Sequence, residues 1–517
     1  MPTREGRQFR VRTSYVITAA VVATVIARLP LLGLPAWADE AGFLMVGSGW
    51  HLGDSSSEGT LYHAYWVDRP PVLIGLYGFA DRLGGLEALR LVGALAAAVT
   101  VVCVGWIAHS LDGPHAAQWA AVTGAALLST PFHWSFMVDG ELLAAPFVAA
   151  GIGCLLSGVA ADGRRGLMLS FAGGASGAAA ILTKQNIGDV LVFATGFLLM
   201  GLLVGSITSA KVVRHAAAFV AGVVVSGGVV ATWTVAHGTS LGSVFYAMYP
   251  FRIDGAQATS RGLTRIAWHR LLDLGVAALL SGLLVLIVWV AVWGMRHRNR
   301  RAAVLALLAV VIFDVISVAA GTNYWLHYLI QPVVAVAALT GLVAARESWA
   351  RAFSVGTVVM ALLGWSVLMV SPPQTAEELV GKAIAGASRE GDSIVTLPGR
   401  PNVSYAAGLP SPYPYLWALP ARTLDPGGAR LKKLLAGPTA PTWIVVIRRF
   451  RRPPSPGSLG ATIVQHYRPV ARICGKTVYL NRDVERRPPT PHPRPDATST
   501  SKCESVAVVP HLLRELA

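Results

Sequence analysis

Residues 91–108 read LVGALAAAVTVVCVGWIA, without a single charged side chain. An apolar run of that length is what an α-helix needs to cross the hydrocarbon core of a bilayer. Hydrophobic residues make up 54% of the 517 positions and charged residues only 14%, against about 25% in soluble domains. The sequence therefore predicts a polytopic α-helical membrane protein. Comparable runs stand at residues 15–34, 116–136, 142–160, 167–182, 190–207, 216–236, 274–293, 302–320, 329–345 and 353–370, which predicts about eleven transmembrane helices.

This composition excludes a cytosolic enzyme, a nucleic-acid-binding domain and a fibrous chain. The net charge of +16 does not indicate a nucleic-acid partner, because the basic residues sort into short loops and the C-terminal part. The abundance of Arg over Lys, with much Ala, Gly and Val, is typical of a bacterial genome of high GC content. Four cysteines are too few for a disulfide framework. Cys474 and Cys503 could pair outside the cell, but Cys503 stands in a compositionally biased tail, so we expect no bridge.

The distribution of charge predicts the topology. Basic residues gather in alternate loops, which the positive-inside rule assigns to the cytoplasm together with the N-terminus. The acidic residues of the membrane part fall on the opposite side. An odd number of helices then sends everything after residue 370 outside the cytoplasmic membrane of the cell. The cytoplasmic groups are Arg4, Arg7, Arg10, Arg12, Arg164, Arg165, Lys211, Arg214, Arg296–Arg301, Arg346 and Arg351.

The chain divides into four parts by composition. Residues 1–14 form a cytoplasmic N-terminus, 15–370 the transmembrane part, 371–482 a small extracytoplasmic α/β domain, and 483–517 a tail whose Pro, Arg, Ser and Thr content predicts disorder. Two external loops, 35–90 and 237–273, are too long to be simple connections. In the first, residues 71–83 predict a short helix lying in the membrane interface. In the α/β domain we expect strands at 393–397, 442–447 and 477–480, with helices at 376–387 and 428–435.

Three polar motifs on the outer side could carry chemistry. Asp39 and Glu40 directly follow the first helix, where burial or a nearby cation would tune a carboxylate for work as a base or metal ligand. Arg69 precedes Pro70 and Pro71, which fix the backbone and aim the guanidinium at the level of a lipid phosphate. The third motif is Asp139-Gly140-Glu141 at the outer end of the third span. Taken singly, these motifs are also typical of a solvated helix end, a headgroup anchor and a polar turn.

In their order and shared sidedness, the motifs resemble the membrane-embedded GT-C glycosyltransferases, in the branch of protein-O-mannosyltransferases and aminoarabinose transferases. That family has Asp-Glu after its first helix, a Lys-Pro-Pro-Leu-like motif in the first external loop and an Asp at the outer end of helix three. Thr183-Lys184-Gln185 and the segment Tyr324 to Tyr328, with His327 before Pro332, are similar too. The resemblance covers most of residues 15–370, which it identifies as a GT-C-like catalytic domain. Arg69 departs from it, since Lys is usual there.

The resemblance implies transfer of a sugar from a polyprenyl-phosphate donor to an extracytoplasmic acceptor, with inversion. Mannose is the best guess for the sugar, and the acceptor is a glycolipid, a polysaccharide or a protein. Asp39 is the candidate base, with Glu40 in support. Arg69, Lys184 and His327 are candidates for the donor phosphate, and Asp139, Glu141 and Tyr328 for substrate. A divalent metal cation is left open as cofactor, with Asp39, Glu40 and His327 as its candidate ligands.

Other readings stay open at this point. A transporter or flippase of lipid-linked or small-molecule substrates would also have many helices, but it should show repeated halves and midplane charges. A non-catalytic lipid-binding scaffold would tolerate the loss of Asp39. Asp314 lies within a span and is either functional or paired with a neighbouring helix. An aromatic stretch in the α/β domain would either stack on sugar or dock that domain onto the membrane part; it comprises Tyr405, Tyr413, Tyr415 and Trp417.

Overall fold

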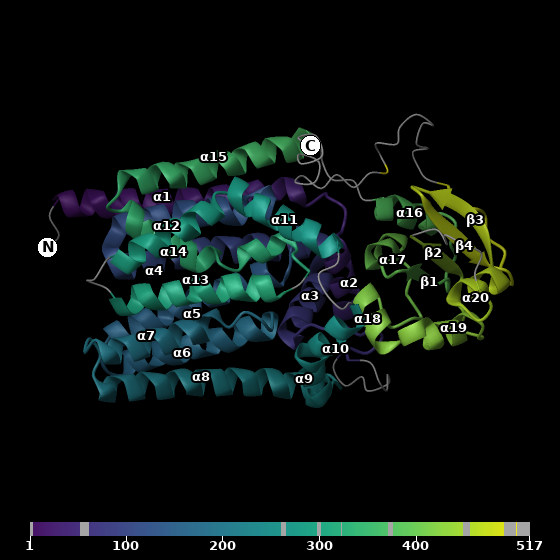
Figure 1. Ribbon diagram of the computed structural model, residues 1–517, viewed down its shortest axis with the longest axis horizontal. Helices are drawn as coiled ribbons and strands as arrows, with labels where there is room; N and C mark the ends of the chain where they lie inside the picture. Colours follow the sequence, from purple (N-terminus) through teal and green to yellow (C-terminus); the bar gives the residue numbers. More distant parts are fainter. Residues whose placement is uncertain are drawn as a thin grey trace.

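A computed structural model of the chain describes residues 4–51, 61–259, 265–296, 301–321, 323–370, 376–447, 455–490 and 503. Long helices form a bundle, and a smaller α/β unit lies at one end of it (Figure 1). Of the expected tail at 483–517, the described residues include 483–490 and Cys503, and the rest lies outside them. The bundle helices are α1 (Arg4–Arg28), α4 (Leu86–Ser129), α5 (Gly140–Ala160), α6 (Gly163–Thr183), α7 (Asp189–Leu203), α8 (Ser209–Ala236), α11 (Arg265–Leu280), α12 (Leu283–Arg296), α13 (Arg301–Ala320), α14 (Val333–Ala344) and α15 (Ser348–Val370).

Within the described ranges, eight helices are long and apolar enough to cross a membrane, or nine if α11 and α12, bent by 69°, form one span. Helix α4 is a hairpin of two helices, because Asp112 and Gly113 leave helical geometry. A Cβ on Gly105 would lie 3.5 Å from the carbonyl oxygen of Ala117, which a straight helix would place about 18 Å away. The expected apolar runs thus overlap a helix or an arm of α4, except that the run at 274–293 crosses the bend between α11 and α12. The number of crossings stays a prediction.

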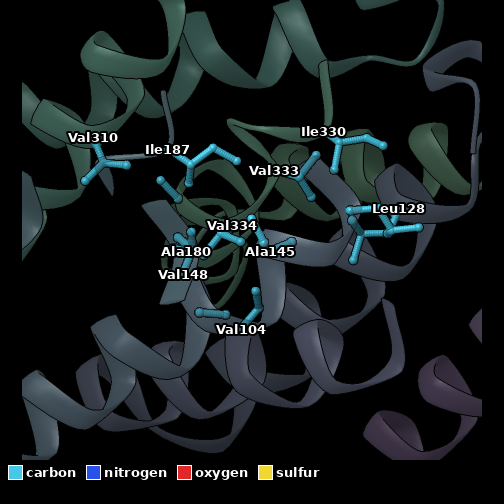
Figure 2. Packing of buried hydrophobic residues seen from close by; sticks show 14 of the residues in the cluster. Val104, Leu128, Ala145, Val148, Ala180, Ile187, Val310, Ile330, Val333 and Val334 are labelled. Carbon is cyan, nitrogen blue, oxygen red and sulfur yellow. The ribbon is translucent and has the colours of Figure 1, made fainter. Parts of the chain in front are cut away.

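The centre of the bundle is α14, in which every residue from Val333 to Ala344 is buried. It packs between α4, α12, α13 and α15. Figure 2 shows the close packing around it, where Val333 and Val334 meet small and branched side chains such as Val104, Ala145 and Val148. Buried apolar runs from distant parts of the sequence therefore form one continuous core.

The two long loops fold into short helices between the bundle and the α/β unit (Figure 1). The expected helix at residues 71–83 is present as α3, which Pro70 precedes in extended geometry and Pro71 begins. Helices α2 and α3 cross with their backbones almost touching, since a Cβ on Gly47 would lie 2.5 Å from the amide nitrogen of Gly78. The helices of these loops are α2 (Ala38–Ser48), α3 (Pro71–Gly84), α9 (Leu241–Met248) and α10 (Pro250–Thr259). The 3₁₀ turns η1 (Leu29–Leu31), η2 (Pro131–His133) and η3 (Leu326–Ile330) lie in other connections.

The α/β unit contains a four-stranded sheet with the order β1-β2-β4-β3. Strand β1 (Ile394–Leu397) runs parallel to β2 (Trp443–Val446), and β4 (Lys476–Asn481) is antiparallel to both β2 and β3 (Tyr467–Ile473). The sequence predicted three of these strands and missed β3. The helices are α16 (Ala376–Ala385), α17 (Pro401–Ala407), α18 (Ala418–Leu424), α19 (Ala429–Leu435) and α20 (Leu459–His466), with η4 (Pro426–Gly428).

One expectation for this unit is wrong. Cys474, in the turn between β3 and β4, forms a disulfide with Cys503. The biased composition of the tail had argued against a bridge, but Cys503 lies next to Cys474. Disulfides are typical of oxidising, extracytoplasmic compartments.

Candidate active site

The first part of the site is the start of α2, where Asp39 and Glu40 occupy the first turn. Negative charge is favoured there by the helix dipole. Successive residues of a helix point about 100° apart, so the two carboxylates meet different partners.

Glu40 is fully buried in an ion pair with Arg90, whose Nη2 lies 3.0 Å from Oε2. The backbone N–H of Trp37 donates to the same oxygen, and Oε1 accepts from Arg90 Nε and the N–H of Val138. Each carboxylate oxygen thus accepts two hydrogen bonds. Arg90 also donates to carbonyl oxygens after the first helix, those of Leu31, Leu32, Leu34 and Pro35. Glu40 therefore fixes where α2 begins relative to α1, α4 and α5.

Asp39 is half-buried and makes one hydrogen bond to a side chain far along the sequence. Its Oδ1 accepts from the indole Nε1 of Trp417 at 2.9 Å. Among the described residues, none donates to Oδ2. Of the adjacent pair, Asp39 is thus the carboxylate with an oxygen left for another group.

Arg69 stands at the end of the segment that leads into α3. Its Nη1 lies 2.9 Å from Asp68 Oδ1, and its guanidinium lies 5.5 Å from the ring centre of Phe43. Burial lowers the pKa of this guanidinium, but Asp68 and Asp39 outweigh it and the net pKa is raised, so Arg69 stays charged. Arg252 of α10 lies 3.6 Å from the other Asp68 oxygen, which adds a second cation at this place.

The densest polar cluster joins α5, α6 and η3. Asp139 caps α5, accepting from the Leu142 N–H through Oδ1, and Glu141 follows in the first turn. Glu141 Oε1 is ion-paired with the ammonium group of Lys184, which ends α6. His327 faces both carboxylates, with Nδ1 3.8 Å from Asp139 Oδ2 and Nε2 3.9 Å from Glu141 Oε2. All four side chains are buried.

Lys184 connects this cluster to an aromatic ring. Its Nζ lies 5.0 Å from the ring centre of Tyr328, a distance suited to a cation–π contact. A Cβ on residue 140 would lie 2.8 Å from Lys184 Cδ. The absence of a side chain at Gly140 therefore leaves space for the Lys184 side chain. Burial lowers the pKa of Lys184, and burial together with Glu141 raises the pKa of Asp139.

Asp139, Glu141 and His327 have the donor set of a metal site. One ligand atom from each lies within 4.8 Å of the others. Asp139 Oδ2, Glu141 Oε2 and His327 Nδ1 are buried and lack a hydrogen-bond partner among the described residues, which is costly unless another group satisfies them. Lys184 compensates the charge of Glu141, and a cation would favour the ionised form of Asp139, whose pKa is raised by burial. The residues present therefore fit a divalent cation.

A second group of buried carboxylates lies further inside the bundle. Asp189 of α7 and Asp314 of α13 are both fully buried. Gln331 donates to Asp314 at 2.9 Å, and Asn186 donates to Gln331. Asp314 is thus paired with a residue just before the neighbouring helix α14, which was one of the two readings of this residue.

Most of the expected site residues come together. Glu141 lies at ion-pairing distance from Lys184 and His327, and the ring of Tyr328 lies beside both of these side chains. Asp39 and Arg69 are close enough to Tyr328 to act on it electrostatically. Glu40 faces Arg90 instead. Of the three expected metal ligands only His327 belongs to the cluster of ligand atoms, in which Asp139 and Glu141 replace Asp39 and Glu40.

The residues that sequence reasoning missed are partners of the expected ones. Arg90 and Trp417 lie 50 and 378 positions from the carboxylates they contact, so no local pattern links them. Docking was one of the two readings of the aromatic stretch, and Trp417 does pack on α2 beside Phe43, with ring centres 5.2 Å apart.

The fold is shared with known membrane glycosyltransferases. ArnT from Cupriavidus metallidurans, solved bound to undecaprenyl phosphate, superposes with a TM-score of 0.63 over 90% of this chain and 97% of its own, at 16% sequence identity. The archaeal oligosaccharyltransferase AglB from Archaeoglobus fulgidus, in complex with an inhibitory peptide and a dolichol-phosphate, gives 0.54 over 84% of this chain and 69% of its own, at 11% identity.

A further structure of the Archaeoglobus fulgidus oligosaccharyltransferase, in complex with Zn and sulfate, also gives a TM-score of 0.54, at 12% identity over 90% of this chain and 73% of that one. No protein-family model and no curated protein sequence matches the chain. The predicted resemblance to the GT-C glycosyltransferases is confirmed at the level of the fold: a helical membrane bundle with a small α/β unit at one end.

Proposed function

We propose that this protein is an integral membrane glycosyltransferase that moves a sugar from a polyprenyl-phosphate donor to an acceptor, with inversion. The observation that carries the proposal is the meeting of carboxylates with Arg69 and Lys184 at one end of an apolar bundle, in a fold shared with a protein that binds undecaprenyl phosphate. A lipid-linked donor presents its phosphate at the membrane surface, so a site at helix ends suits it. A transporter or flippase is not favoured, because the solved structures of this fold cited above are transferases.

The proposed roles follow from charge and accessibility. Asp39 accepts the proton of the acceptor hydroxyl, since Oδ2 makes no hydrogen bond within the described residues. Arg69 and Lys184 stabilise the leaving phosphate, with His327 as a further donor. Asp139, Glu141 and Tyr328 border the same space and orient substrate. Glu40 supports Asp39 by fixing the first turn of α2 through Arg90.

We further propose a divalent metal cation as cofactor. Asp139, Glu141 and His327 would hold it, and its charge would add to the stabilisation of a phosphate oxygen. Lys184 compensates one carboxylate and thus leaves room for a single such ion.

The sugar and the acceptor are proposed only by class. Mannose is our candidate, with arabinose or another sugar as alternatives, and the acceptor is a glycolipid, a cell-envelope polysaccharide or a protein hydroxyl. Mass spectrometry of the polyprenyl-phosphate and glycan pools of a deletion strain measures both directly: the donor accumulates and the product is lost.

The sharpest test of the function is Asp39→Asn. This change keeps size and shape but removes the proton acceptor, so transfer should fall by ~10²–10⁴-fold. The assay uses the purified full-length protein in lipid nanodiscs, a radiolabelled polyprenyl-phosphate sugar and a crude envelope acceptor fraction. Donor-lipid binding should survive, because Asp39 is only half-buried.

The matched control is Asp254→Asn, a carboxylate on the neighbouring helix α10 that accepts from Tyr246. It should transfer sugar at the normal rate. Near-normal turnover by Asp39→Asn, with donor binding intact, would show that Asp39 is not the base. If the wild-type protein transferred sugar from none of the donor classes, the proposed function itself would be contradicted.

A further inference from the structure

The side chain of Trp417, which belongs to the α/β unit, contacts the candidate site. Trp417 precedes α18, and its indole N–H donates to Asp39 Oδ1 at 2.9 Å. The ring lies beside Phe43 of α2, at 5.2 Å between ring centres. A residue 378 positions away in the sequence therefore contacts the carboxylate that we propose as base.

The backbone of α2 is adapted to this indole. A Cβ on Gly42 would lie 2.2 Å from Cζ2 and 2.6 Å from Cη2 of Trp417, and 3.0 Å from Pro401 Cγ. Gly42 stands one helical turn after Asp39, so the ring packs on the face of α2 that presents the carboxylate. Any other residue at position 42 would displace the ring.

The rest of the α/β unit holds Trp417 in place. Helix α17 packs on α2 and α18 on α10. The backbone N–H of Trp66 donates to the carbonyl oxygen of Pro414, and the Ser411 N–H donates to the hydroxyl of Tyr65. Leu416 is buried in the core that the membrane helices form. These contacts fix the segment before Trp417 on the first external loop.

We propose that Trp417 is a positioning residue for Asp39, so that the α/β unit completes the catalytic centre. This inference rests on the proposed function. The indole holds Oδ1 and thereby turns Oδ2 toward the acceptor, and its N–H stabilises the ionised carboxylate. A role in packing alone would need the ring but not the N–H.

The test compares Trp417→Phe, which keeps a flat ring and removes the donor, with Trp417→His, which keeps an N–H. Full-length protein in nanodiscs is assayed with the radiolabelled polyprenyl-phosphate sugar. We expect kcat to fall about tenfold in Trp417→Phe, with the donor KM within about twofold, and partial recovery in Trp417→His.

The pH–rate profile gives a second readout. Trp417→Phe removes a hydrogen bond to the charged form of the carboxylate, so the acid limb of the profile should move to higher pH. The titratable groups that the structure places near Asp39 remain in both proteins, so the difference between the two profiles reports the lost donor. They are Arg69, Tyr77 of α3, and His327 and Tyr328 of η3.

Gly42→Ala tests the same contact from the other side, since its Cβ should push the indole away and reproduce the loss in kcat. Gly49→Ala is its matched control, because a Cβ there meets no atom closer than 3.7 Å. Trp365→Phe controls for the loss of an indole donor, here one that binds the Ser129 carbonyl oxygen. Both controls should behave like the wild type.

The outcomes separate the two proposals. Unchanged kcat and pH profile in Trp417→Phe, with Asp39→Asn inactive, would overturn the positioning role and leave the function standing. Loss of activity only in proportion to lost thermal stability, without a shift of the acid limb, would also overturn it. Full activity of Asp39→Asn would overturn the base and this inference together.

Discussion

At the scale of single residues, the cluster around His327 combines two buried carboxylates with polar atoms that none of the described residues satisfies. Asp139 and Glu141 bring two carboxylates, and Lys184 compensates one of them. Their unsatisfied oxygens and His327 Nδ1 are buried, where an orphaned polar atom costs about 1–3 kcal/mol. Carboxylates combined with one imidazole suit Mn²⁺ and Zn²⁺.

We therefore predict that Mn²⁺ or Zn²⁺ raises the thermal unfolding temperature of the purified protein, and that a chelator reverses the rise. A ligand at a hundred times its Kd stabilises the folded state by about 2.7 kcal/mol. His327→Gln should abolish the rise. Differential scanning fluorimetry in detergent measures it without reference to activity.

His133→Gln is the control for this experiment. His133 is equally buried, but its two nitrogens already face the Leu127 carbonyl oxygen and the Ser281 hydroxyl. That variant should keep the metal-dependent rise. An equal rise in His327→Gln, or none in the wild-type protein with either ion, would contradict a metal at this cluster.

The adjacent carboxylates Asp39 and Glu40 illustrate how much of the site could be predicted from the sequence. The pair Asp39-Glu40 could be predicted as part of a polar site from its place after the first helix. Which of the two is free could not, because that depends on Arg90 and Trp417, whose positions only the tertiary fold determines. The ligand group around Asp139 was missed as a set for the same reason.

At the scale of elements, long apolar helices were predictable because a bilayer demands a length and a composition that few other structures share. The runs at 91–108 and 116–136 correspond to the two arms of α4, which Asp112 and Gly113 separate. Strand β3 was missed because it contains Pro469 and has a register shift before Ala471, which break the alternating pattern. Short helices such as α17 and α18 contain too few turns to show a clear hydrophobic periodicity in the sequence.

The ion pair between Glu40 and Arg90 connects several of these elements. Arg90→Gln would leave Glu40 charged and fully buried, with its cation gone, which typically costs about 3–5 kcal/mol. We predict a corresponding loss in the free energy of unfolding, measured by denaturant titration in detergent. Combining Arg90→Gln with Glu40→Gln should restore part of it, because no unpaired charge remains.

The exposed pair between Lys382 and Glu378 on α16 provides a comparison, since exposed pairs are worth at most about 1 kcal/mol. Lys382→Gln should change stability little. If Arg90→Gln were as mild, the buried pair could not be what anchors the start of α2.

At the scale of the whole molecule, α1 begins at the end of the bundle remote from the α/β unit, and the candidate site lies between bundle and unit (Figure 1). The sequence predicted this opposition from loop charges, but it could not predict that the unit docks on α2. The disulfide between Cys474 and Cys503 supports placing the unit outside the cytoplasm.

Orientation in the membrane follows as the last prediction. Glu390 is exposed in the α/β unit, and Asp162 is exposed in the turn between α5 and α6, beside the basic residues Arg164 and Arg165. We predict that an impermeant maleimide labels Glu390→Cys in intact cells and Asp162→Cys only after permeabilisation, because the basic turn stays in the cytoplasm. Replacing Cys103 and Cys154 by Ala beforehand removes the two free thiols. The reverse pattern would put the carboxylates of the site on the cytoplasmic face, where an acceptor outside the membrane could not reach Asp39.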